Sequence, residues 1–263
     1  MVLVANAQPA PEQTKRMLKD GYNKAADQYL AFVRKQPEAW KTRLAVLEHL
    51  YEYLGVDKDA AGKALTVLDL GCGAGEPSTL ALAAHPGIGK IIANDQSSAQ
   101  LGLLKKSATD AGNVEKLDFI ESDMMTLSLP DASLDAVVAY YSIIHLPTQE
   151  QIELMSRIRR WLKPGAYFAG CFTAEKSEGH VMKGWLGMDS YWSGLGAEGS
   201  EGMLEESGFR VQRKEVVREH VDASFLFVIA ETVEEGKGGK GAGVEEGFGY
   251  EPGRSAGLLA KGT

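Results

Sequence analysis

The sequence has little cysteine and no long apolar run. Only two cysteines occur among its 263 residues, Cys72 and Cys171, with neither a C-x-x-C pair nor a histidine at metal-ligand spacing. Both lie in apolar runs, so buried thiols are expected, and neither a disulfide nor a metal site is predicted. No run is long enough to span a bilayer, and the first residues lack the basic region of a signal peptide. A soluble, cytoplasmic protein with no membrane partner is expected.

An excess of basic residues is also absent. Lysine and arginine together number 28 against 36 aspartate and glutamate residues, which gives a formal net charge of -8. No dense stripe of Lys and Arg occurs. Because nucleic-acid affinity comes largely from neutralised phosphates, no nucleic-acid partner is expected.

Helical periodicity marks the first part of the chain. Apolar residues at helical spacing predict one helix over residues 14–36. Pro37 suits the start of a second helix, and Gly55 can end it in the left-handed conformation. Residues 14–55 are therefore expected to form a helical cap, preceded by a flexible N-terminus over residues 1–13.

From about residue 64, short apolar runs alternate with helical segments at 76–84, 97–111, 148–162 and 199–207. The strand-like runs are Leu65–Leu70, Lys90–Asn94, Leu117–Glu121, Leu134–Tyr140, Ala166–Phe172, Phe209–Arg218 and Ser224–Glu231. This alternation indicates βαβ units and a parallel sheet with helices on both faces, and the last two runs are close enough to pair antiparallel. The predicted fold class is α/β, with a seven-stranded, mostly parallel mixed sheet whose last strand is antiparallel.

Two segments fall outside this alternation. Residues 173–198 are irregular and rich in glycine, methionine and aromatic residues. Residues 233–263 are rich in glycine, lysine and glutamate with few apolar groups. Such a composition cannot bury enough surface to offset chain entropy, so this C-terminal tail is expected to be disordered.

A glycine-rich run, Asp69-Leu-Gly71-Cys-Gly73-Ala-Gly75, follows the first predicted strand and precedes a helix. Glycines let a ligand approach the backbone, and the helix start offers free N–H groups. The dinucleotide pattern Gly-x-Gly-x-x-Gly/Ala fails here. Counting from Gly71 puts Glu76 at its third position, and counting from Gly73 puts Ser78 there. An acidic residue at that position would also repel a pyrophosphate.

The run fits Asp-x-Gly-x-Gly-x-Gly instead, and over residues 15–231 the chain resembles the Class I S-adenosylmethionine-dependent methyltransferases. The resemblance implies a Rossmann-like domain over residues 14–232 with a cofactor-binding core at 64–172. It implies S-adenosylmethionine as the cofactor, and methyl transfer to a small, partly apolar acceptor with oxygen favoured. Residues 173–198 would form a substrate lid, whose methionines and aromatic residues suit such an acceptor but would equally pack on the sheet edge.

The same resemblance assigns cofactor contacts along the chain. Asp69, Gly71 and Gly73 would hold the methionine end, with Gly75 in the same loop. Asp95, followed by Gln96, would accept from both ribose hydroxyls, a position also compatible with a helix N-cap. Asp123 and Met124 would contact the adenine, although Asp123 also suits an ordinary turn, and Tyr140 would face the cofactor from the end of the fourth strand.

Two further side chains are candidates for covering the cofactor and for acid–base catalysis. Tyr22 matches a tyrosine that closes over the cofactor in this family, yet as a member of an apolar stripe it also suits a core. His145, just past the fourth strand, is the candidate catalytic base for an acceptor that must lose a proton, with a pKa near 6.5 before any shift. A histidine bonded only to backbone would fit the same position.

Two other functions are compatible with these residues. One is an enzyme that uses the charge of S-adenosylmethionine in a non-methyl step such as a cyclisation, and the other is a non-catalytic cofactor-binding protein. The Asn/Asp-Pro-Pro-aromatic tetrapeptide of amino-group methyltransferases for macromolecules is absent after the fourth strand. The sequence indicates neither the acceptor nor the oligomeric state.

Overall fold

A computed structural model of the chain describes residues 10–56, 64–220, 223–233 and 243–249. The helices are α1 (Pro11–Lys24), α2 (Ala26–Arg34), α3 (Pro37–Leu54), α4 (Ser78–Ala84), α5 (Ser98–Asp110), α6 (Thr148–Trp161) and α7 (Gly196–Glu206), with short 3-10 helices η1 (Val114–Lys116) and η2 (Ile143–His145). The strands are β1 (Leu65–Leu70), β2 (Ile88–Asp95), β3 (Leu117–Glu121), β4 (Leu134–Ala139), β5 (Leu162–Thr173), β6 (Lys176–Trp185), β7 (Met188–Leu195), β8 (Phe209–His220), β9 (Ala223–Thr232) and β10 (Glu245–Glu246).

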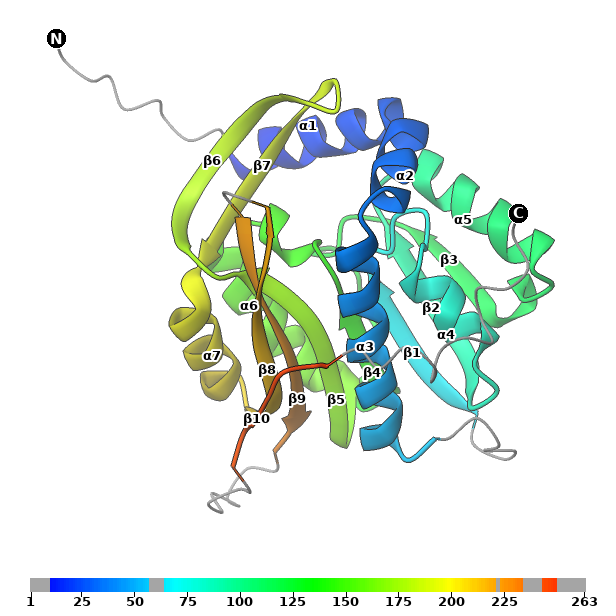
Figure 1. The fold of residues 1–263 in the computed structure, drawn as a ribbon, viewed down its shortest axis with the longest axis vertical. Coiled ribbons are helices and arrows are strands. Elements are labelled where there is room, and N and C mark those ends of the chain that lie inside the picture. Colours follow the sequence, from blue (N-terminus) through cyan, green and yellow to red (C-terminus); the bar gives the residue numbers. More distant parts are fainter. Residues whose placement is uncertain (1–9, 57–63, 221–222, 234–242, 250–263) are drawn as a thin grey trace, which may run out of the picture.

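One large sheet has the strand order β10-β8-β9-β5-β4-β1-β2-β3 (Figure 1). Strands β1 to β5 pair in parallel, and β9 runs antiparallel to both β5 and β8. The predicted mixed sheet of seven strands is confirmed, and the two-residue β10 adds an eighth. Helices cover both faces, as the alternation predicted.

Neighbouring residues of β1 belong to two different cores, because side chains alternate across a strand. Val67 packs in a cluster with residues of α3, α4 and α5, whereas Leu68 packs in a second cluster with residues of α6 and α7. The two helical layers therefore hold the sheet between them. Among the residues described, no helix is long and apolar enough to cross a bilayer.

The N-terminal helices differ from the prediction in three ways. Helix α1 begins at Pro11, so residues 11–13 are helical rather than flexible, while residues 1–9 lie outside the described residues. The expected single helix over 14–36 is two helices, which change direction at Ala25 (Figure 1). Apolar spacing continues through that residue, so periodicity alone does not reveal the bend. Helix α3 packs on the sheet, with Leu47 and Leu50 in its core, and is not part of a cap over the site.

The segment predicted as an irregular lid is a β-hairpin. Strands β6 and β7 pair antiparallel in a sheet of their own and extend beside α1 (Figure 1). The register shifts between Ser177 and His180 and again between Met182 and Trp185. These irregularities break the two-residue alternation by which a strand is found in a sequence, so the hairpin resembles a loop there.

The tail is ordered where it meets the sheet, which corrects the prediction of disorder for residues 243–249. Residues Glu245–Glu246 add β10 in parallel to β8. The side chain of Phe248 is 2% exposed and belongs to the same core as α3. The prediction rested on the average composition of the tail, which does not reveal the effect of a single buried aromatic residue in a glycine-rich stretch. Residues 234–242 and 250–263 lie outside the described residues.

Candidate functional site

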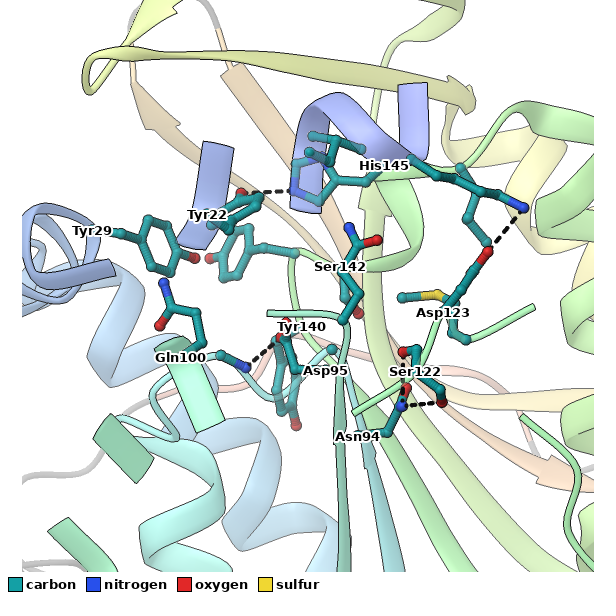
Figure 2. Close-up of a pocket in the computed structure, with 18 residues that line it drawn as sticks. Tyr22, Tyr29, Asn94, Asp95, Gln100, Ser122, Asp123, Tyr140, Ser142 and His145 are labelled. Atoms are coloured by element: carbon teal, nitrogen blue, oxygen red, sulfur yellow. Dashed lines mark hydrogen bonds and ion pairs between the residues drawn. The ribbon is translucent and has the colours of Figure 1, made fainter. Parts of the chain in front are cut away.

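A cavity lies at the carboxyl ends of β1, β2, β3 and β4, beneath α1 (Figure 2). The chain adds β2 and β3 on one side of β1 and then crosses back to add β4 on the other side. Ligands of such sheets bind at this switch point. The lining includes most of the predicted site residues: Tyr22, Gly71, Gly73, Asp95, Gln96, Asp123, Met124, Tyr140 and His145.

Glycine is required in the loop after β1 for steric reasons. Gly71 has φ +73°, and a Cβ there would lie 2.4 Å from Cβ of Ser142. Gly73 has φ +56°, and a Cβ there would project between Tyr29 and Gln100, both of which line the cavity. A Cβ on Gly75 would lie 2.3 Å from Cδ1 of Leu104. Gly75 therefore serves packing against α5 and is outside the cavity lining.

Asp69 lies behind this loop rather than in the cavity lining. Its side chain is buried, and Oδ2 accepts a hydrogen bond of 2.6 Å from the Thr79 hydroxyl on α4. Burial raises the pKa of Asp69 to about 7, against the opposing effect of the Thr79 bond. The carboxyl thus joins the end of β1 to α4.

Asp95 connects the glycine loop to the start of α5. Its Oδ2 accepts from the Gly73 N–H at 2.9 Å and its Oδ1 from the Ser97 N–H at 2.8 Å. Each carboxylate oxygen keeps a second lone pair for a ligand. Burial raises the pKa of Asp95, while the backbone donors oppose that rise. The N-cap of α5 is Ser97, whose hydroxyl accepts from the Gln100 N–H, so Asp95 faces the cavity without being the cap.

Asp123 forms a turn and an ion pair at once. Its Oδ1 accepts from the Met125 N–H at 2.9 Å, and its Oδ2 lies 3.1 Å from Nζ of Lys15. The same ammonium lies 3.1 Å from Glu150. Sequence reasoning missed Lys15, because its two partners are far along the chain and no local spacing connects them.

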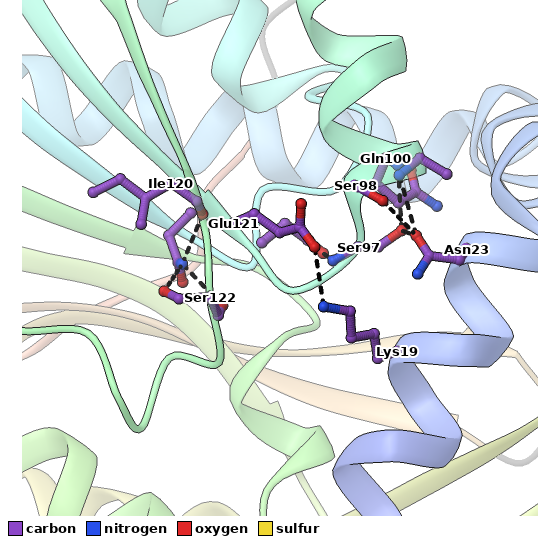
Figure 3. Close-up of polar contacts among 11 residues, drawn as sticks. Lys19, Asn23, Ser97, Ser98, Gln100, Ile120, Glu121 and Ser122 are labelled. Carbon is purple, nitrogen blue, oxygen red and sulfur yellow. Dashed lines mark hydrogen bonds and ion pairs between the residues drawn. The ribbon is translucent and has the colours of Figure 1, made fainter.

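One polar face of α1 contacts the rim of the cavity. Residues 15, 19 and 23 recur every fourth position, so Lys15, Lys19 and Asn23 share this face. Nζ of Lys19 lies 3.0 Å from Oε1 of Glu121, at the end of β3 (Figure 3). Oδ1 of Asn23 accepts from the Ser97 hydroxyl at 2.8 Å and from the Ala99 N–H at 3.1 Å. Helix α1 therefore covers the cavity through side-chain contacts with both β3 and α5.

His145 and Tyr22 form a hydrogen-bonded pair on the cavity wall (Figure 2). Nδ1 of His145 lies 2.8 Å from the Tyr191 carbonyl oxygen, which can only accept, so Nδ1 carries the proton. Nε2 then accepts from the Tyr22 hydroxyl at 2.9 Å. Burial lowers the pKa of His145 to about 4, well below the value near 6.5 expected from the sequence.

The β6–β7 hairpin covers the site from the side of α1 and α2. The Trp185 ring packs edge-on against Tyr29 and Phe32, and Trp192 packs near His145 and Phe225. Trp185 and Trp192 thus contact Tyr29 and His145 of the cavity lining and are not themselves part of it. The hairpin therefore shapes the site through the residues it supports.

A buried amide in the lining supports a polar ligand. In the part of the chain that the structure describes, neither polar atom of Gln100 has a hydrogen-bond partner. Buried polar groups are nearly always paired, so these atoms indicate a missing partner. With the opening at Gly73 and the Asp95 carboxylate, the residues present fit S-adenosylmethionine.

Comparison with known proteins gives the same result. Residues 67–165 match the sequence profile of a family described as a methyltransferase domain. A sterol 24-C-methyltransferase of Gibberella zeae is 35% identical over 156 residues, which cover 56% of this chain and 39% of that protein. An O-methyltransferase of Pyrenophora dematioidea is 26% identical over 163 residues, which cover 59% of this chain and 58% of that protein. The chain covers 26–39% of the length of the first curated relatives it matches.

A solved structure shares the fold. The 1,6-didemethyltoxoflavin-N1-methyltransferase of Burkholderia thailandensis, with bound 1,6-didemethyltoxoflavin and S-adenosylhomocysteine, has a TM-score of 0.64 at 16% identity. The match covers 86% of this chain and 92% of that one. By the profile match, residues 67–165 form a methyltransferase domain, and the chain shares the fold of solved S-adenosylmethionine-dependent methyltransferases.

Proposed function

We propose that this protein transfers a methyl group from S-adenosylmethionine to a small, partly apolar molecule, with an oxygen atom as the favoured acceptor. The observation that carries the proposal is the Tyr22–His145 pair, which lines the same cavity as the glycine loop and Asp95. A proton acceptor and a cofactor site in one enclosed space are what methylation of a hydroxyl requires.

Different residues of the lining would bind different parts of the cofactor. Gly71 and Gly73 leave room for the methionine end, Asp95 would accept from the ribose hydroxyls, and Asp123 with Met124 would meet the adenine. When bound, S-adenosylmethionine supplies an electrophilic methyl group on a sulfonium. Helix α1 closes over this space and excludes water, which supports alignment of the acceptor.

The pair on the wall would take the acceptor's proton. A neutral His145 with Nδ1–H bonded to Tyr191 presents a lone pair at Nε2 to the Tyr22 hydroxyl. The Tyr22 oxygen can accept the proton of an acceptor hydroxyl while passing its own to His145. Because the pKa of His145 is lowered to about 4 by burial, it is too weak a base to ionise an alcohol in advance. The proton would therefore leave as the methyl group is transferred.

The nature of the acceptor is supported by the surroundings and by the relatives. Trp185, Trp192 and Met188 belong to the hairpin that covers the site, and apolar and aromatic side chains suit an apolar acceptor. Matched relatives are described as acting on a sterol carbon and on an oxygen. Both are consistent with a small organic acceptor.

Turnover with a panel of hydroxylated aromatics and sterols tests the activity. Mass spectrometry should find one product that has gained a single methyl group, with an equal amount of S-adenosylhomocysteine formed. A rearranged product of unchanged mass without S-adenosylhomocysteine would support the cyclisation alternative. Tight binding of S-adenosylhomocysteine with no product from the whole panel would instead support a cofactor-binding protein.

The cofactor site is tested separately by Asp95→Ala. Calorimetry should show S-adenosylhomocysteine binding and no NAD binding to the parent, and the variant should lose about 1–3 kcal/mol of binding free energy, as for lost charge-assisted hydrogen bonds. Asp118→Ala is the matched control, because Asp118 is an exposed carboxylate on β3 that pairs with Lys90 at the surface. Equal affinity in Asp95→Ala and its parent would contradict the placement of the ribose.

A further inference from the structure

Ser190 of β7 carries a fully buried hydroxyl that the fold does not use. Its exposed fraction is 0%, and among the residues described its Oγ has no hydrogen-bond partner. Buried polar groups are nearly always paired, because an unpaired one destabilises the folded state. Alanine would fill the same place without that cost. The stability of the fold therefore does not explain a serine at this position.

Strand β7 turns this hydroxyl toward α1. Alternate residues of a strand share a face, so Ser190 lies on the same side of β7 as Met188. A Cβ built on Gly21 would lie 3.0 Å from Sδ of Met188, so this side of the strand packs against α1. Gly21 is the residue before Tyr22. Ser190 is therefore placed on the side of the hairpin that faces Tyr22.

The same strand also holds the other end of the Tyr22–His145 pair. The Tyr191 carbonyl oxygen accepts from Nδ1 of His145 at 2.8 Å, and Nε2 of His145 lies 2.9 Å from the Tyr22 hydroxyl (Figure 2). Burial raises the pKa of Tyr22 well above its ordinary value, and the neighbouring Ser190 hydroxyl opposes that rise. Ser190, Tyr22 and His145 thus belong to one buried polar group.

The proton relay between Tyr22 and His145 would benefit from a third group. In that relay the Tyr22 oxygen takes the acceptor's proton and gives its own to Nε2 of His145. Burial lowers the pKa of His145 to about 4 and raises that of Tyr22, so this second transfer is unfavourable and negative charge develops on the phenolic oxygen. A hydroxyl aimed at an oxygen where charge develops stabilises the transition state.

We propose that Ser190 is a positioning residue for the reaction, donating a hydrogen bond to the Tyr22 oxygen while that oxygen passes its proton to His145. The acceptor loses its O–H bond as its oxygen takes the methyl group, Tyr22 regains a proton, an N–H bond forms at Nε2 of His145, and Ser190 keeps its own proton. Hydrogen bonds of this kind often tighten only in the reacting complex. The proposal rests on the proposed methyl transfer to a hydroxyl.

Ser190→Ala removes the hydroxyl alone and tests the proposal. Steady-state kinetics with a hydroxylated acceptor should show kcat lowered by about 10- to 100-fold, the loss expected for one hydrogen bond to a charged group. The KM for the acceptor and the affinity for S-adenosylhomocysteine should stay within about twofold of the parent, because Ser190 is outside the cavity lining. The melting temperature should equal or exceed that of the parent, because the hydroxyl that is removed has no partner.

A second buried serine provides the matched control. Ser200 of α7 is also 0% exposed, and in the described part of the chain its Oγ also has no hydrogen-bond partner. Ser200→Ala should therefore keep the kcat of the parent. The double variant Tyr22→Phe with Ser190→Ala should be no slower than Tyr22→Phe, since Ser190 acts through the oxygen that Tyr22→Phe removes.

Three results would overturn the proposal. An unchanged kcat in Ser190→Ala would show that the hydroxyl takes no part in the reaction. A double variant slowed by the full factor of Ser190→Ala below Tyr22→Phe would mean that Ser190 acts independently of Tyr22. A melting temperature several degrees below that of Ser200→Ala would assign Ser190 a structural role. Absence of turnover by the parent with every hydroxylated acceptor would instead overturn the proposed function, which separates the two failures.

Discussion

Replacing His145 with alanine is expected to lower kcat by roughly 10²–10⁴, the usual contribution of a positioned acid or base. Tyr22→Phe removes the hydroxyl that bonds His145 Nε2, so it should cause a loss of similar size. Because the two groups would act as a unit, the double variant should be little worse than either single one. Affinity for S-adenosylhomocysteine should change much less than kcat.

A second substitution separates chemistry from structure. His145→Gln keeps a hydrogen-bond donor and an acceptor but has no basic nitrogen. If His145 only holds Tyr191 and Tyr22 in place, this variant should recover most of the rate lost in His145→Ala. Recovery of the rate would contradict the catalytic role. Tyr53→Phe, at the end of α3 where Tyr53 packs beside Tyr167 and outside the cavity lining, controls for loss of a tyrosine hydroxyl.

The pH profile adds an independent measurement. Burial lowers the pKa of His145 to about 4, so its imidazole is neutral, and able to accept a proton, throughout the range above about pH 5. The rate in the parent should therefore be flat from about pH 5 to pH 8 and fall only as the pH approaches 4. An acid limb centred near 6.5 that disappears in His145→Gln would mean that His145 is solvated during turnover. A limb that remains in that variant would belong to Asp69, whose pKa burial raises to about 7.

Phe248→Ala should destabilise the protein by about 3 kcal/mol, because it removes a fully buried aromatic ring from a core. For a chain of this size the melting temperature should fall by roughly 6–12 °C. The ring is 2% exposed and lies next to His49 of α3, and the adjoining backbone is bonded to β8 through Arg213 and Glu215. Deletion of everything after Val233 should have at least this effect, contrary to what composition alone suggests.

Val244→Ala is the matched control for this segment. Its side chain is 45% exposed in the same stretch of the tail, so its truncation should leave the melting temperature within about 1 °C of the parent. Equal melting temperatures for Phe248→Ala and Val244→Ala would mean that the Phe248 ring contributes no stability and that this segment does not pack against β8. Thermal unfolding followed by circular dichroism is sufficient to decide.

The sheet and the glycine loop could be predicted because their signals are local. Each of the seven predicted strands is a short apolar run bounded by turns, and the Asp69–Gly75 run follows one of them directly. The position of Asp95 near the glycine loop could also be predicted, because the carboxyl ends of neighbouring parallel strands lie at the same edge of the sheet.

The remaining features depend on contacts between distant residues. Lys15 meets Asp123 and Glu150 only after α1 has folded across the sheet. In the sequence, Gln100 resembles any polar residue of an exposed helix. The structure leaves it 1% exposed, and α1 and α2 pack against its helix α5. His145 was found by its position after β4, but the shift of its pKa follows from burial, which no spacing reveals.

The cover over the cavity is held partly by ion pairs, and these differ in their contact with solvent. Lys19 and Glu121 expose 45% and 44% of their side chains, whereas Lys15 and Asp123 expose 14% and 24%. Dissolved ions weaken attraction between exposed charges, over a screening length of about 8 Å at physiological ionic strength and about 3 Å at 1 M salt. Added salt should therefore weaken the more exposed Lys19–Glu121 pair first, while the less exposed Lys15–Asp123 pair still holds α1 to the rest of the site. The rate at which ligands enter and leave would then depend on ionic strength, even where the sheet beneath does not change.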